Sequence, residues 1–133
     1  MTGTCTYTTE LRTECVHLHS GTMIYTDAPL DNHGKAQAFS PTDLVATALA
    51  SCLLTTIALS GRTHNFNIDG AKAGFTKHMV NDPRRIARID VDVTMPQRAY
   101  TDKEKTMIEH IGNNCPVTKS LHSDIEVNIV YKW

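Results

Sequence analysis

The stretch SPTDLVATALASCLLTTIALSG, residues 40–61, predicts a long helix with a well-defined start. Ser40 can accept a hydrogen bond from the first-turn amides, and Pro41 suits the first helical position. Asp43 complements the positive end of the helix dipole. We expect the helix to end just before Gly61, because glycine is the usual residue after a helix C-terminus.

Cys52 lies on the apolar side of this predicted helix. It follows Leu44 and Ala48 at intervals of four residues, and Val45, Leu49 and Leu53 lie beside these three. We expect this stripe to be buried. Free cysteine is among the most buried residue types and packs as a small hydrophobic side chain. The residues alone therefore favour a structural role for Cys52, with a reactive role as the second interpretation.

Strand patterns precede and follow the helix. Before it, a Thr-rich run at 4–11 and runs at 15–19 and 23–26 predict an antiparallel meander. After it, the patterns predict two strands, two helices and a closing strand, at residues 66–80, 86–95, 101–111, 116–121 and 125–131. Gly112 is expected to end the first of these helices. The order βββ-α-ββ-αα-β is α+β, and we expect one domain over residues 1–133.

The composition is that of a folded domain with almost no net charge. Lys and Arg number 13 and Asp and Glu number 14, which leaves −1 and no long-range field, so nucleic acid is not expected as a partner. The first ten residues lack the basic and apolar segments of a secretory signal. The apolar window 44–59 is too short and too rich in hydroxyl groups to span a bilayer. We expect a cytoplasmic protein without a membrane partner, whose cysteines stay reduced unless they do chemistry or bind metal.

Cys115 has a local reason to be reactive. Pro116 suits the first position of the short helix predicted after it, which places Cys115 at the N-cap. The amides and the positive dipole end favour a thiolate there, and Lys119 lies one turn further on. A simple capping role, such as Ser performs, explains the position equally well. The sequence separation from Cys52 neither supports nor forbids a contact, because disulfide feasibility depends on geometry in space.

Cys15, His17 and His19 alternate along a predicted strand and would share one face. Thiolate and imidazole groups suit zinc or copper, so a metal site is one interpretation. A fourth ligand is not evident, and we favour a polar strand face with no metal and no cofactor. Cys5 has no partner that the sequence identifies, and we interpret Cys5 and Cys15 as structural.

Two windows of the sequence resemble the OsmC/Ohr family of hydroperoxide reductases. Residues 40–52, SPTDLVATALASC, are similar to the helix that carries the first cysteine of that family. Residues 115–121, CPVTKSL, are similar to its second-cysteine motif, a Cys-Pro-Val-Ser-Lys type of sequence. The resemblance in element order covers nearly the whole chain.

This resemblance implies a fold and a reaction. The fold would be OsmC-like, with antiparallel sheets around long central helices in an intertwined homodimer whose sites lie at the subunit interface. In the reaction, Cys52 would attack the terminal oxygen of an organic hydroperoxide, release an alcohol and become a sulfenic acid. Cys115 would condense with it to a disulfide, which an external dithiol would reduce.

The resemblance also implies a cation beside Cys52, because only the thiolate is a good nucleophile. In the family this cation is an Arg from the N-terminal region, steered by a Glu, and Arg12 is our candidate. Many members carry the Glu directly after the helix-start Pro, where this chain has Thr42, and Asp43 comes one residue later. The departure motivates an alternative, a non-enzymatic OsmC-like protein that binds a ligand or senses redox state.

Overall fold

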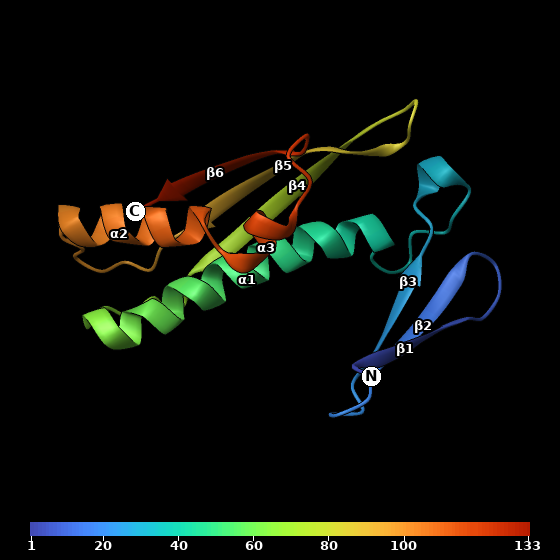
Figure 1. Cartoon of the computed structure of the whole chain (residues 1–133), viewed down its shortest axis with the longest axis horizontal. Coiled ribbons are helices and arrows are strands. Elements are labelled where there is room, and N and C mark those ends of the chain that lie inside the picture. The colour runs from blue at the N-terminus through green and yellow to red at the C-terminus, as the bar shows by residue number, and fades with distance from the viewer. The chain divides into compact units, whose positions relative to one another are not determined.

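The expected order of elements is present along the chain (Figure 1). The structure, a computed structural model, describes residues 1–133 and confirms the α+β class and the order βββ-α-ββ-αα-β. One short 3-10 turn, Leu30–Asn32, is added in the loop after the third strand. The chain divides into two compact units, which we call unit 1 (residues 1–45) and unit 2 (residues 46–133). The assignment of residues 1–133 to one domain stays a prediction.

Unit 1 contains the predicted antiparallel meander. Its strands are β1 (Gly3–Tyr7), β2 (Arg12–His17) and β3 (Met23–Asp27), hydrogen-bonded in that order. The first strand ends well before residue 11, because Glu10 and Leu11 adopt positive φ angles of 50° and 63° in the turn to β2. These left-handed conformations are incompatible with a continuing strand.

Unit 1 has no apolar interior. The side chains that are buried in it are polar: Thr26, Asp27 and Ser40. The large apolar side chains of its sheet region are exposed, namely Tyr7, Leu18, Met23, Ile24 and Tyr25. A three-stranded sheet ordinarily needs an apolar face packed against another element. Unit 1 therefore presents apolar surface that a further surface can cover.

Helix α1 (Pro41–His64, 24 residues) is longer than expected. Gly61 does not end it but is buried within it, where an added Cβ would lie 2.4 Å from the carbonyl oxygen of Phe66. Glycine is therefore required there for a close approach of backbone, not for termination. By length and composition α1 could cross a membrane, which corrects the expectation for the window 44–59, but the core helix of a soluble protein meets the same criterion.

The buried stripe of α1 confirms Leu49 and Leu53 of the predicted one but not Cys52 or Ala48. The residues that it buries in unit 2 are Ala46, Leu49, Ala50, Leu53, Ile57 and Gly61. Ala48, which we expected on this stripe, is exposed, and Cys52 is only half-buried. The stripe follows Leu49, Leu53 and Ile57 at intervals of four residues, and Cys52 lies at its edge. The thiol of Cys52 therefore keeps access to the surface of the chain.

The sheet of unit 2 consists of β4 (Lys72–Val80), β5 (Arg85–Thr94) and β6 (Glu126–Lys132), in that order. β4 and β5 are antiparallel, whereas β5 and β6 are parallel, which corrects the expectation of purely antiparallel sheets. The chain passes through two helices between β5 and β6, and such a crossover returns it in the same direction. The alternation of β5 is confirmed by the buried residues Ile89, Val91 and Val93.

The crossover helices are α2 (Asp102–Asn113) and α3 (Pro116–Ser120), which lie beside α1 in Figure 1. Gly112 was expected to end α2 but is buried inside it. A Cβ on Gly112 would lie 2.1 Å from the hydroxyl of Tyr131 and 3.0 Å from Cδ1 of Ile57. The missing side chain thus lets α2 approach both α1 and β6.

Candidate active site

Cys115 is the N-cap residue of α3, as the sequence predicts. It follows the close contact at Gly112, and its own amide donates to the carbonyl oxygen of Gly112 at 3.4 Å. The side chain is fully buried. Its sulfur lies 3.3 Å from Oγ1 of Thr118, one turn into α3. The thiol is thus enclosed by the start of its own helix.

The surroundings of Cys115 favour its thiolate. Burial by itself would raise the pKa of this thiol. Hydrogen bonds from the hydroxyl and amide of Thr118, the thiol of Cys52 and the amide of Val117 outweigh burial, so the pKa is lowered. The amides of Thr118 and Val117 act as expected at an N-cap, but the Thr118 hydroxyl contributes more, and Lys119 is not among the main causes.

Cys52 lies near Cys115, because its thiol is one of the groups that lower the pKa of the Cys115 thiol. The two residues come from different elements, the middle of α1 and the start of α3. The sulfur of Cys52 also lies 3.9 Å from Oγ1 of Thr56, whose hydroxyl donates to the carbonyl of Cys52 at 2.7 Å. Unit 2 therefore brings together the two cysteines that the family motifs single out.

Tyr131 of β6 is a neighbour of this pair that the sequence analysis did not identify. Its hydroxyl donates to Oδ1 of Asn113 at 3.4 Å. Burial, together with the negative charges of Glu109 and Cys115, raises the pKa of Tyr131 far above its ordinary value. Tyr131 therefore places a neutral phenol near Cys115. Its place in an alternating strand gave no signal beyond that of a packing residue.

A cavity of about 560 Å³ lies between β6 and the junction of α2 with α3. Asn113 and Thr118, the partners of Tyr131 and Cys115, form part of its wall. The remaining lining residues belong to β6: Val127, Asn128, Ile129 and Val130. The cavity therefore has a wall of mixed polar and apolar groups, and Thr118 connects it to Cys115.

Arg12 is held in unit 1 by Asp27, a partner that the sequence analysis missed. Its Nε donates to Oδ1 of Asp27 at 2.7 Å and its Nη2 donates to Oδ2 at 2.9 Å, a bidentate pair. Nη2 also donates to Oε1 of Gln37 at 3.0 Å. The hydrogen bond from Arg12 lowers the pKa of Asp27, and the reciprocal bond raises the pKa of Arg12. Arg12 is thus a fixed cation, and its role in activating Cys52 stays a prediction.

Asp43 forms a reciprocal cap at the start of α1. The amide of Ser40 donates to Oδ2 of Asp43 at 2.8 Å, and the amide of Asp43 donates to Oγ of Ser40 at 3.1 Å. This arrangement satisfies two backbone donors at the helix start and agrees with the start signals in the sequence. The proposed catalytic role of Asp43 stays a prediction beside this capping role.

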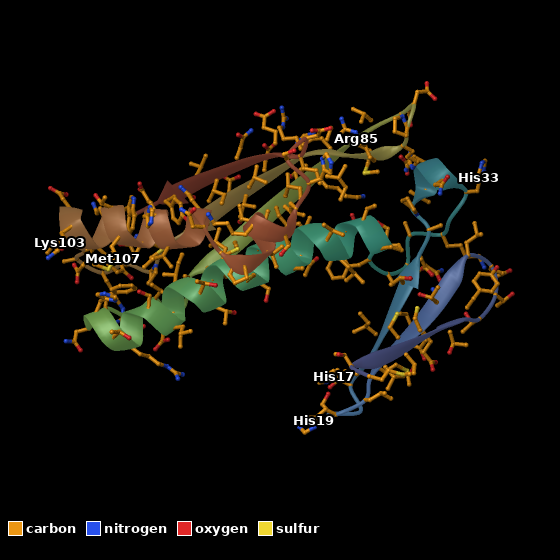
Figure 2. All side chains as sticks on the ribbon, in the orientation of Figure 1. His17, His19, His33, Arg85, Lys103 and Met107 are labelled. Carbon is orange, nitrogen blue, oxygen red and sulfur yellow. The ribbon has the colours of Figure 1, made fainter.

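The suggested metal ligands of unit 1 do not form a metal site. No group of three or more His, Cys, Asp or Glu side chains in residues 1–133 is placed to hold one metal ion. β2 ends at His17, and His19 lies in the turn beyond it, so His19 is not on the strand face of Cys15 (Figure 2). Nδ1 of His17 instead pairs with Oγ of Ser20 at 2.7 Å.

The comparisons with known proteins agree with this picture. The OsmC family, described as OsmC-like protein, matches residues 33–130. A solved structure from Psychrobacter arcticus 273-4, provisionally named an osmotic stress induced and detoxification response protein, is 43% identical, with a TM-score of 0.93. The match covers 98% of this chain and 95% of that chain. A search of curated proteins found no match.

Two more distant structures share the fold. An organic hydroperoxide resistance protein OsmC from Legionella pneumophila is 11% identical over 100% of this chain and 98% of that chain, with a TM-score of 0.79. A provisionally named organic hydroperoxide resistance protein from Vibrio cholerae, with captopril bound in one of its active sites, is 14% identical. That match covers 98% and 91% of the two chains, with a TM-score of 0.73. The resemblance in the two cysteine windows is thereby confirmed at the level of the family, and the chain belongs to the OsmC-like proteins.

Proposed function

We propose that this protein is a thiol-dependent peroxidase that reduces organic hydroperoxides with Cys52 and Cys115. Family membership and the relatives named for hydroperoxide resistance support a peroxide-related role. The observation that carries the specific proposal is the proximity of two thiols, one on α1 and the other at the N-cap of α3. A second thiol beside the attacking one limits over-oxidation, because it traps the sulfenic acid as a disulfide.

The different burial of the two thiols divides the roles between them. Cys115 is fully buried, so a hydroperoxide cannot reach its sulfur directly, although its thiolate is favoured. Cys52 is half-buried at the edge of the α1 stripe and remains reachable. Nucleophilic attack needs access as well as thiolate character. We therefore assign the attack to Cys52 and the resolving step to Cys115.

The proposed reaction balances in three steps. The thiolate of Cys52 attacks the terminal oxygen of ROOH, the O–O bond breaks, and the alkoxide takes a proton to leave as the alcohol. Cys52 is then a sulfenic acid, and the thiolate of Cys115 attacks its sulfur, which releases water after protonation and forms the Cys52–Cys115 disulfide. An external dithiol exchanges with this disulfide and restores both thiols.

Arg12 is proposed as the cation that stabilises the charge on Cys52 and on the departing alkoxide. The bidentate contact with Asp27 supports this, because it holds the guanidinium in one orientation. Because such a cation is already in position, it stabilises the developing negative charge without the reorganisation that solvent would need. In this proposal Asp27, together with or in place of Asp43, supplies the carboxylate that steers the Arg.

We propose a homodimer as the working form. The support is the absence of a buried apolar side chain in residues 1–45, together with exposed Met23 and Tyr25 on β3. Both lie on the sheet face that carries Arg12, according to the strand register. If Arg12 acts at a thiol site, this face is the one that a second copy of the chain would cover.

The proposal is tested by following consumption of cumene hydroperoxide with dithiothreitol as the reductant. Cys52→Ser should reduce the rate by a factor on the order of 10³ or more, because the nucleophile is removed. Cys115→Ser should still perform one turnover and accumulate a Cys52 sulfenic acid that dimedone labels. Replacing Cys5 by Ser is the matched control and should leave the rate unchanged. Wild-type rates in Cys52→Ser would refute the assignment.

The alternative, a non-enzymatic OsmC-like protein that binds a ligand or senses redox state, makes the opposite prediction. The wild-type chain would then consume no hydroperoxide under the same conditions. Ligand binding would also persist after Cys52 and Cys115 are both replaced. The peroxidase assay therefore separates the two functions even while the ligand is unidentified.

A further inference from the structure

Cys5 and Cys15 face each other across β1 and β2 in unit 1. The strand register pairs the two residues directly, and the sulfur of Cys15 lies 3.0 Å from the sulfur of Cys5. Both are free thiols. The sequence analysis left Cys5 without a partner, and the structure corrects this: its partner is Cys15. Neither residue belongs to the Cys52–Cys115 pair of unit 2.

The backbone at this position suits a disulfide between the strands. The amide of Thr8 donates to the carbonyl of Arg12, which marks one hydrogen-bonded pair of the β1–β2 ladder. Hydrogen-bonded and non-hydrogen-bonded pairs alternate along an antiparallel ladder, so Cys5 and Cys15, three pairs away, occupy a non-hydrogen-bonded position. Cα atoms there are about 4.5 Å apart, which is within the range that a disulfide spans. The bridge therefore requires no separation or slippage of the strands.

The thiols of Cys5 and Cys15 differ in pKa and in exposure, and this difference decides which of them reacts first. A hydrogen bond from Cys15, followed by one from Thr13, lowers the pKa of Cys5. The same contact with Cys5, together with burial, raises the pKa of Cys15. Cys5 is exposed and Cys15 is half-buried. Cys5 is thus the accessible nucleophile, and Cys15 is the nearby thiol that can displace whatever Cys5 acquires.

We propose that Cys5 and Cys15 form a second redox-active dithiol, which small aliphatic disulfides convert to a reversible disulfide across β1 and β2. The thiolate of Cys5 attacks one sulfur of RSSR, forms a mixed disulfide and releases RS⁻. Cys15 loses its proton, attacks the Cys5 sulfur and displaces the second RS⁻. Two electrons pass from the two thiols to the small disulfide, which leaves as two RSH after protonation.

A disulfide is the matching oxidant because of what surrounds Cys5. The groups that lower its pKa are the thiol of Cys15 and the hydroxyl of Thr13, and neither carries positive charge. Attack on a hydroperoxide gains from a cation that stabilises the developing alkoxide. Thiol–disulfide exchange needs only an accessible thiolate and a second thiol within reach. The pair meets both of these requirements.

Tryptic mapping of the wild-type protein tests the proposal directly, because each cysteine falls in a different peptide. Cys5, Cys15, Cys52 and Cys115 lie in residues 1–12, 13–35, 36–62 and 106–119. The protein is incubated with oxidised glutathione, its remaining thiols are alkylated, and it is digested without reduction. The expected product is peptide 1–12 linked to peptide 13–35, lighter than the two free peptides by two hydrogen atoms. Dithiothreitol should separate them again.

Variants of the full chain isolate the second pair. In the double variant Cys52→Ser with Cys115→Ser, oxidised glutathione should remove both remaining titratable thiols and leave no glutathione attached. Adding Cys15→Ser should trap one glutathione on Cys5, because the displacing thiol is gone. Circular dichroism before oxidation verifies that each variant is folded. A non-reducing gel should show the oxidised double variant at the mass of a single chain.

Four results would overturn the proposal. Peptide 1–12 linked to residues 36–62 or 106–119 would make Cys5 a partner of the other pair. A glutathione retained separately on Cys5 and on Cys15 would mean that the two sulfurs do not react with each other. A link between two chains on the non-reducing gel, or two thiols that persist in the folded double variant, would contradict the intrachain exchange.

Discussion

The two units each carry one pair of neighbouring cysteines, but they place these pairs in opposite environments. In unit 2 the pair lies against a core, and Cys115 is fully buried at a helix N-cap. In unit 1 the pair spans two strands of a sheet with no apolar interior, and Cys5 is exposed. Burial decides which chemistry is open to each pair. The buried pair can be reached only through Cys52, whereas the exposed pair is open to a small disulfide from solution.

The same contrast governs stability. Unit 2 buries aliphatic side chains from a helix and a strand, such as Leu53 and Val91, which gives it a core of its own. Unit 1 instead buries the carboxylate of Asp27, whose partner Arg12 keeps 36% of its side chain exposed. Such an ion pair gives a definite geometry but is weak evidence of stability. Unit 1 therefore depends on covering its exposed apolar side chains, and four experiments can break or sharpen this comparison.

The largest effect is expected from truncating matched isoleucines in the two units. Ile57 of α1 is 0% exposed and Ile24 of β3 is 45% exposed. Ile57→Ala should lower the free energy of unfolding by about 2–5 kcal/mol, because it leaves a cavity in a packed core. Ile24→Ala should cost less than about 1 kcal/mol. Urea unfolding followed by circular dichroism measures both, and equal losses would show that unit 1 is packed as unit 2 is.

The next effect concerns the proposed dimer. Met23 and Ile24 are adjacent on β3 and similarly exposed, at 47% and 45%, but they lie on opposite faces of the sheet. Met23→Asp should raise the dissociation constant of the dimer by about 100-fold or more. The reason is that dimerisation would bury the new carboxylate on the sheet face that carries Arg12. Ile24→Asp is the matched control and should change the dissociation constant little. Sedimentation of both variants over a range of concentrations measures their dissociation constants. A larger effect of Ile24→Asp than of Met23→Asp would place the interface on the other face of the sheet.

A smaller effect is expected at the close contact between α2 and its neighbours. Gly112→Ala should destabilise the protein by about 1–3 kcal/mol, because the new Cβ meets the Tyr131 hydroxyl and the Ile57 side chain. Gly74→Ala in β4 is the control, since an added Cβ there meets nothing within 4 Å. Its change in unfolding free energy should stay within about 0.5 kcal/mol. If the two variants unfold at the same urea concentration, the contact at Gly112 does not matter.

These contacts explain how far the sequence could lead. Local signals were sufficient for the element order, the capping of α1 at Ser40 and the N-cap position of Cys115. They failed at Gly61 and Gly112, because glycine at a close tertiary contact looks the same in sequence as glycine at a helix end. The parallel pairing of β6 likewise depends on the crossover through α2 and α3, which a strand pattern does not encode.

The candidate site divides in the same way. Two family motifs identified Cys52 and Cys115, although only the fold brings their thiols together. Asp27 and the Cys5–Cys15 contact were missed because each depends on strand register. Arg12 stands directly opposite Asp27, and Cys5 stands directly opposite Cys15. Counting the strand register outward from the β1–β2 and β2–β3 turns would have identified both pairs.

The smallest expected effect is a change in the pH dependence of unit 1. The hydrogen bond from Arg12 is the main cause that lowers the pKa of Asp27 below its ordinary value of 3.8, and the amide of Gln37 contributes while burial opposes. A carboxyl whose pKa is lowered by folding adds stability above its unfolded pKa, and this is lost as pH falls through the folded pKa.

Amide hydrogen exchange in β2 and β3 should therefore be constant from neutral pH down to about 5 and faster below about 4, after correction for the intrinsic rate. Asp27→Asn should abolish this pH dependence, while the amides of α1 around the buried Leu53 serve as an internal control in both proteins. The same variant should slow hydroperoxide reduction by about 10- to 100-fold if Asp27 positions Arg12 for the reaction. Arg12→Lys keeps the charge but loses the bidentate geometry, so it should slow the reaction similarly. A full rate in both variants would separate the ion pair from the chemistry and leave it with a structural role in unit 1.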